Sequence, residues 1–166
     1  MKKGLVIADA GPIFSLAIVN KLKLLNQLFD EVRIPRAVWN EITLDNKPNF
    51  YKSIKRFFES KITEIKSFNK LTFIMDYGES ESVILYKELN ADFLLIDDKK
   101  ARHIAENFNI KCIGTLGVLS KAKEKGIIKD LRPIFISFLK NDRYYSINLL
   151  NKLLEKYNEP KIQYKA

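Results

Sequence analysis

The sequence predicts an α/β fold, in which a mainly parallel sheet of about five strands lies between two layers of helices. Two observations support this three-layer α/β/α sandwich. Short apolar runs alternate along the chain with longer segments whose apolar residues have helical spacing. Two of the apolar runs end directly in acidic residues, as expected where a ligand binds at the carboxyl ends of parallel strands.

The apolar run Phe93–Ile96 is the clearest predicted strand. It is too short for an ordinary helix, and its uniform apolar character is typical of a strand buried on both faces. Asp97-Asp98 follows it, just as Asp9 follows the apolar run Leu5–Ala8. If the two strands are parallel neighbours, these carboxylates meet at one edge of the sheet. Because grouped carboxylates repel one another, the pattern predicts a hard cation with oxygen ligands there.

Turn residues and apolar spacing separate the elements in the first half of the chain. Gly11-Pro12 predicts a turn after the first strand. Pro35 ends the brief strand Val32–Ile34 and suits the first turn of the next helix. Residues 69–77 show no clear period and are expected to form a loop that leads towards the site. The other expected elements are helices at 13–19, 21–29, 35–42 and 50–58, a loop at 45–48 and a strand at 62–65.

The second half continues the alternation of helix and strand. A helix from Gly78 to Leu89 precedes the Phe93 strand, and Thr115 is expected to cap a later helix. The polar tail 158–166 is expected to fray. We expect a single domain at residues 1–157, with a core at about 4–125 and a helical extension at about 130–157. The other expected elements are helices at 99–108, 116–125, 133–140 and 147–157 and a strand at 111–113.

Composition narrows the classes of function. The 166 residues carry a net charge of +9, which favours a polyanionic partner such as nucleic acid. No apolar stretch is long enough for a membrane span, and the run before Asp9 is too short for a secretory signal. The single Cys112 excludes an internal disulfide and suits a reducing cytoplasm. One His and one Cys argue against a zinc site and against a Cys–His nucleophile.

Glu79 and Glu81 lie at the start of the helix that leads into the Phe93 strand. Residues two positions apart point about 200° apart around a helix, so these two side chains cannot both face one metal ion. Either of them also suits a helix start without any further role, because it complements the helix dipole. The sequence leaves open which glutamate faces the sheet.

Four motifs occur in the order found in the PIN-domain family, and together they give the chain a resemblance to it. The Gly-Glu-x-Glu and Ile-Asp-Asp forms resemble a prokaryotic branch related to the VapC-like toxins. The resemblance runs from about residue 4 to 125, and the last helices are similar to the C-terminal extension of that branch. The motifs are Val6-Ile-Ala-Asp9-Ala-Gly-Pro-Ile13, Val32-Arg-Ile-Pro35 with Val38-Trp-Asn-Glu41, Gly78-Glu-Ser-Glu81, and Leu94-Leu-Ile-Asp97-Asp98-Lys-Lys-Ala-Arg102.

The resemblance implies a ribonuclease that depends on Mg²⁺ or Mn²⁺. It assigns the four acidic positions to Asp9, to Glu41, to Glu79 in preference to Glu81, and to Asp97 or Asp98. In the commonest toxin pattern the third acid is Asp, and a Thr stands two residues before the last Asp; this chain has Glu79 and Ile96 instead. The resemblance also implies a small antitoxin partner, a groove that it would bury, and a homodimer.

The chemistry that we expect is metal-assisted hydrolysis of RNA phosphodiester bonds. Asp9, Asp97 or Asp98, and Glu79 or Glu81 are the candidate metal ligands, and Glu41 is a candidate to orient water or accept its proton. Phosphate contacts are expected from Lys99, Lys100 and Arg102, although a solvated helix face explains these three residues equally well.

Other interpretations stay open at this point. A phosphoaspartyl phosphatase usually has a second Asp two residues after the first, where this chain has Gly11, and a receiver domain carries its Asp pair after its first strand. The alternative from another class is a PIN-like module that binds protein or RNA with weak or no catalysis. The apolar residues near Phe135, Phe138 and 149–154 suit either core packing or the antitoxin groove or dimer interface.

Overall fold

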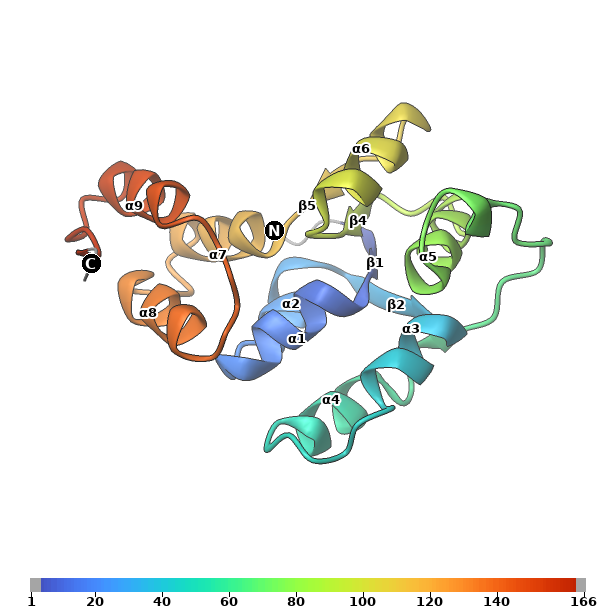
Figure 1. Cartoon of the computed structure of the whole chain (residues 1–166), viewed down its shortest axis with the longest axis horizontal. Helices are drawn as coiled ribbons and strands as arrows, with labels where there is room; N and C mark the ends of the chain where they lie inside the picture. The colour runs from blue at the N-terminus through green and yellow to red at the C-terminus, as the bar shows by residue number, and fades with distance from the viewer. Residues whose placement is uncertain (1–3, 164–166) are drawn as a thin grey trace. The chain divides into compact units, whose positions relative to one another are not determined.

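The computed structural model describes residues 4–163 of the chain, which divide into two compact units (Figure 1). The first unit ends at Thr115 and the second begins at Leu116. That the two belong to one domain stays a prediction. Within residues 4–163, no helix combines the length and the apolar character that a membrane crossing requires.

Five parallel strands form the sheet of the first unit, in the order β3-β2-β1-β4-β5. β1 is the central strand: Val6 lies opposite Val32 of β2, and Ala8 lies opposite Leu95 of β4. The predicted α/β fold with a parallel five-stranded sheet is therefore confirmed, and the two strands followed by acidic residues are neighbours. The strands are β1 (Leu5–Ala8), β2 (Glu31–Pro35), β3 (Ile62–Thr63), β4 (Phe93–Leu95) and β5 (Cys112–Ile113).

Helices connect these strands, as parallel pairing requires. α5 packs against β1, β2 and β4, and it also packs against α3. Ile7 of β1, Leu85 of α5 and Leu94 of β4 are fully buried together in this core. The helices are α1 (Ala10–Ile18), α2 (Lys23–Leu28), α3 (Arg36–Ile42), α4 (Tyr51–Phe58), a 3₁₀ turn (Leu71–Phe73), α5 (Tyr77–Glu88) and α6 (Lys99–Asn107).

Two predictions about proline were wrong. Gly11-Pro12 is not a turn but part of α1, which begins at Ala10. Pro12 is tolerated because the N–H groups of a first helical turn have no partner inside the helix, so a missing N–H costs nothing there. Pro35 ends β2 and caps α3 in extended conformation, and it does not belong to the first helical turn.

The remaining helices are α7 (Thr115–Glu124), α8 (Arg132–Lys140) and α9 (Ile147–Lys156). Phe135 and Phe138 of α8 stack with ring centroids 6.5 Å apart. Both rings are fully buried, as are Leu150 and Leu154 of α9. For these four residues core packing is therefore confirmed, whereas Leu149 of the same helix is 47 % exposed.

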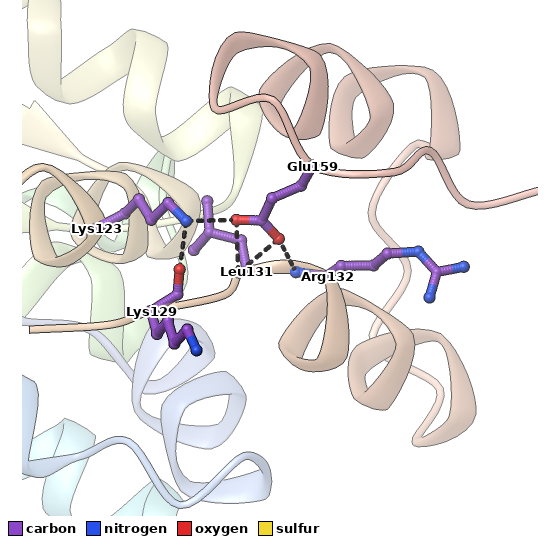
Figure 2. Close-up of polar contacts among 5 residues, drawn as sticks. All are labelled: Lys123, Lys129, Leu131, Arg132 and Glu159. Carbon is purple, nitrogen blue, oxygen red and sulfur yellow. Dashed lines mark hydrogen bonds and ion pairs between the residues drawn. The ribbon is translucent and has the colours of Figure 1, made fainter. Parts of the chain in front are cut away.

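Glu159 fixes the segment after α9 to the start of α8 (Figure 2). Its carboxylate accepts hydrogen bonds from the backbone N–H groups of Leu131 and Arg132, at 2.9 and 2.8 Å. The Nζ of Lys123 lies 2.9 Å from the same carboxylate and also bonds the carbonyl oxygen of Lys129. Residues 158–163 are thus anchored, and the prediction that this part of the tail frays was wrong. Residues 164–166 of the tail lie outside the described residues.

Candidate functional site

Asp9 stands where β1 ends and α1 begins, in the centre of the sheet. Its backbone N–H donates to the carbonyl oxygen of Leu95, 2.9 Å away, so the end of β1 is fixed to the end of β4. The side chain is only 7 % exposed, and its Oδ1 has no hydrogen-bond partner. A buried, unsatisfied carboxylate oxygen is costly, and this one requires a physical explanation.

The surroundings of Asp9 favour its neutral form. Burial raises its pKa most, and the charges of Glu79, Glu41 and Asp97 raise it further, while a hydrogen bond from the backbone N–H of Ala10 lowers it. The result is a pKa of about 7, far above the ordinary value of 3.8. Desolvation and like charges therefore act together on one carboxyl group, a combination that is concentrated at functional sites.

Gly78, in the first turn of α5, lets two of these carboxylates approach. A Cβ at position 78 would lie 2.9 Å from Oε2 of Glu41 and 3.8 Å from Oδ1 of Asp9. A side chain at this position would therefore collide with Glu41. The absence of a side chain at Gly78 allows α3 to bring Glu41 close to the buried Asp9.

Glu79 and Asp76 close the start of α5 with a reciprocal capping box. In one half of the box, Oε2 of Glu79 accepts from the N–H of Asp76, at 3.3 Å. Burial raises the pKa of Glu79, and the charges of Asp98, Asp76 and Glu41 add to this effect. Burial and the charge of Asp76 likewise raise the pKa of Glu41. Asp76 thus belongs to the group of interacting carboxylates, although it was not among the predicted site residues.

The two aspartates after β4 have separate roles in the fold. Oδ1 of Asp97 accepts from the N–H of Thr115 and Oδ2 accepts from its hydroxyl, both at 2.7 Å. Oδ1 of Asp98 accepts from the N–H of Ala101 at 2.8 Å and so caps α6. The charge of Asp97 acts on Asp9, and that of Asp98 acts on Glu79. Each aspartate therefore accepts hydrogen bonds at the start of a helix, and its charge also acts on one of the other carboxyl groups of the site.

Glu81 is not brought into this group. Its side chain is buried, and Oε2 accepts from the backbone N–H of Ala37 at the start of α3, at 2.9 Å. The carboxylate also interacts with the hydroxyl of Tyr77. The sequence left Glu79 and Glu81 as alternatives, and the structure brings only Glu79 close to Asp9.

An open pocket of about 370 Å³ is lined by three of these acidic residues, Asp76, Glu79 and Asp98. Acidic side chains from α5 and from the start of α6 line it, and so does the exposed Lys100. Lys99 is exposed as well. Arg102 is half-buried, and its Nε forms an ion pair with Glu106, 3.0 Å away. The lining residues are Thr72, Phe73, Ile74, Met75, Asp76, Glu79, Asp98, Lys100 and Ala101.

The residues present fit a divalent cation. Carboxylate oxygens are the ligands that Mg²⁺ and Mn²⁺ prefer, and a cation would satisfy the unpartnered Oδ1 of Asp9 and offset the repulsion that raises its pKa. Among residues 4–163, no three Asp, Glu, His or Cys side chains are already gathered tightly enough to form a finished metal site. Binding would therefore require the carboxylates to draw together.

Comparison with protein-family models gives a match. A family model described as a PIN domain matches residues 5–159, which is nearly the whole chain. Proteins of this kind are generally nucleases, and they generally use divalent metal ions. Among curated proteins, none matches this sequence.

Proposed function

The chain belongs to the PIN-domain family, and on this premise we propose that it is a metal-dependent ribonuclease that hydrolyses RNA phosphodiester bonds. The observation that carries the proposal is the environment of Asp9. Its Oδ1 is buried without a partner, and Glu41, Glu79 and Asp97 all raise its pKa. A site that only stabilised the fold would gain nothing from this mutual repulsion.

Asp9 is the central proposed ligand of Mg²⁺ or Mn²⁺, together with Glu79 and with Asp97 or Asp98. When bound, such an ion lowers the pKa of water and neutralises charge that develops on a phosphate. Asp9, whose pKa is about 7, would lose any proton that it carries at neutral pH as the ion binds, because a ligating carboxylate must be ionised. Glu81 is not a proposed ligand, because its carboxylate already accepts a hydrogen bond from the backbone N–H of Ala37.

Glu41 is the proposed proton acceptor. Burial and the nearby Asp76 raise its pKa, so its carboxylate is a stronger base than an exposed glutamate. Lys99 and Lys100 are proposed to contact phosphates of the RNA, since both are exposed and Lys100 lines the acidic pocket. Arg102 is the weaker candidate for this role, because it already pairs with Glu106.

The biological setting is also a proposal. The Gly78-Glu-Ser-Glu81 and Ile96-Asp-Asp98 motifs support a VapC-like toxin with a small antitoxin partner. A homodimer is the proposed assembly, and the lone Cys112 supports a reducing cytoplasm as the location. Co-expression of the chain with the product of a neighbouring small gene would test the pairing, through rescue of growth.

The function is tested by RNA cleavage with the purified protein. We expect cleavage of mixed-sequence RNA with Mn²⁺ or Mg²⁺ and none with EDTA. Asp9→Asn and the double variant Asp97→Asn/Asp98→Asn should both abolish it, while the exposed Glu59→Gln serves as a charge-matched control that keeps activity. Metal-independent cleavage, or cleavage that survives both variants, would show that a contaminant or another site is responsible. An inert protein that still binds RNA would support the alternative, a binding module.

A further inference from the structure

Two phenylalanine rings in the segment before α5 lie almost wholly in solvent. Phe68 is 81 % exposed and Phe73 is 90 % exposed. Apolar side chains of this size are normally buried, and neither ring contributes to the core of the first unit. Packing in the core therefore does not explain why phenylalanine occurs at these two positions, whereas a role in binding a partner molecule would.

The backbone that carries these rings is held in place by α5. The carboxylate of Glu88 accepts hydrogen bonds from the N–H groups of Lys66 and Ser67, at 2.9 and 2.8 Å. Further along, the side-chain amide of Asn69 donates to the hydroxyl of Ser80, at 2.8 Å. Figure 1 shows this segment looping out ahead of α5. The two rings are thus presented on a support that is fixed at more than one point.

Cations alternate with the rings along this segment. The order is Lys66, Phe68, Lys70, Phe73, and both lysines are exposed. Phe73 lines the same pocket as the acidic residues and Lys100. Exposed rings interleaved with lysines match a single-stranded nucleic acid, whose unstacked bases lie on aromatic faces while its phosphates meet the cations.

We propose that Phe68 and Phe73 form a stacking platform for unpaired bases, which holds a single RNA strand across the acidic pocket. The inference rests on the proposed function, since it names residues that would present RNA to that site. A duplex keeps its base faces stacked inside the helix and cannot use the platform. The platform therefore selects single-stranded RNA.

Binding is measured in EDTA, so that no cleavage interferes. The probe is a short single-stranded RNA that contains 2-aminopurine, whose fluorescence is quenched by stacking, and its duplex form is the comparison. We expect Phe73→Ala to weaken single-strand binding about tenfold and to remove part of the quenching, with Phe68→Ala acting in the same direction. Duplex binding should not change, and neither should the thermal stability, because both rings are exposed.

Further variants separate stacking from simple apolar contact. Phe73→Trp should keep or strengthen binding, whereas Phe73→Leu should behave like the alanine variant. Tyr144→Ala is the matched control, since Tyr144 is 88 % exposed but belongs to the other unit and does not line the pocket. Its substitution should leave binding unchanged.

Several results would overturn the platform. If Phe73→Leu or Phe73→Ala bound single strands as the wild type does, the rings would not stack on bases. If the variants changed only the oligomeric state in sedimentation, the segment would be a protein contact. In both cases metal-dependent cleavage by the wild type could still stand. A wild-type protein that neither binds nor cleaves RNA would remove the proposed function and the platform together.

Discussion

Oε2 of Glu81 accepts a hydrogen bond from the backbone N–H of Ala37, 2.9 Å away, and this bond ties α5 to the first turn of α3. The N–H groups at a helix start have no partner within the helix, so a buried carboxylate is well placed to satisfy one of them. Because α3 also carries Glu41, Glu81 supports the site from outside it. Glu79 and Glu81 thus have different roles, although both lie in one turn of α5: Glu79 acts on Asp9, and Glu81 fixes the start of α3.

Substitution of the two glutamates should separate stability from activity. Glu81→Ala leaves the buried N–H of Ala37 without a partner, so we expect the free energy of unfolding to fall by about 1–3 kcal/mol. Glu79→Gln should abolish cleavage without loss of stability in EDTA, because it removes repulsion towards Asp9. Thermal denaturation and RNA cleavage of both variants check this. A Glu81→Ala protein as stable as the wild type would contradict the assignment.

Gly78→Ala tests the close approach of α3 and α5. The added Cβ would lie 2.9 Å from Oε2 of Glu41, the end of a flexible side chain, so the fold should survive while the carboxylate moves. Because small displacements of catalytic groups are costly, we expect cleavage to fall about tenfold or more. Gly11→Ala in α1 is the matched control, since no atom outside its immediate neighbourhood lies within 4 Å of its added Cβ. It should keep activity and gain roughly 0.5–1 kcal/mol of stability.

Asp9 makes the metal-free protein sensitive to pH. Its folded pKa of about 7 lies above its value in the unfolded chain, so its contribution to stability is complete below about pH 4 and is lost as pH rises through 7. In EDTA, the stability of the wild type relative to Asp9→Asn should therefore decline between these values, by at most about 1.4 kcal/mol per pH unit. Urea denaturation at several pH values measures the difference. A difference that is flat across this range would show that Asp9 is ionised throughout.

Glu159 should give the opposite pH dependence in the second unit. Burial opposes its ionisation, but the N–H of Leu131 and the ammonium of Lys123 outweigh burial and hold the pKa of Glu159 below 4.5. Its stabilising contribution is therefore complete above about pH 4.5 and is lost as the pH falls through its lowered folded value.

Substitution of the same residue checks the assignment. We expect Glu159→Gln to lower the free energy of unfolding at pH 7 by about 1–3 kcal/mol, because Lys123 loses its largely buried partner. The exposed Glu155, 3.5 Å from Lys161, is the matched control, and Glu155→Gln should change stability little. Equal effects of the two variants in thermal denaturation would contradict a special role for Glu159.

The sheet and its acidic edge could be predicted because both depend on local patterns. Apolar runs that end in Asp9 and Asp97 predict parallel strands, and neighbouring parallel strands bring those residues to one edge. The start of α1 could not be predicted in the same way, because Gly11-Pro12 suits a turn as well as a first helical turn, and only the packing of the chain decides between them.

The third acid illustrates another limit. The rotation of α5 about its axis decides whether Glu79 or Glu81 faces Asp9. The spacing of apolar residues in the sequence does not determine that rotation. Asp76 was missed because residues 69–77 carry no period. A signal was nevertheless present, since Asp76 with Glu79 three residues later is the spacing of a capping box.

Mn²⁺ binding is the most direct test of the account, because it addresses the acidic group without reference to any particular RNA. The electron paramagnetic resonance signal of free Mn²⁺ is followed as wild-type protein or Asp9→Asn is added at neutral pH. We predict saturable binding by the wild type and binding at least about tenfold weaker for Asp9→Asn. Equal binding by the two proteins, or none by the wild type, would contradict a metal site built on Asp9.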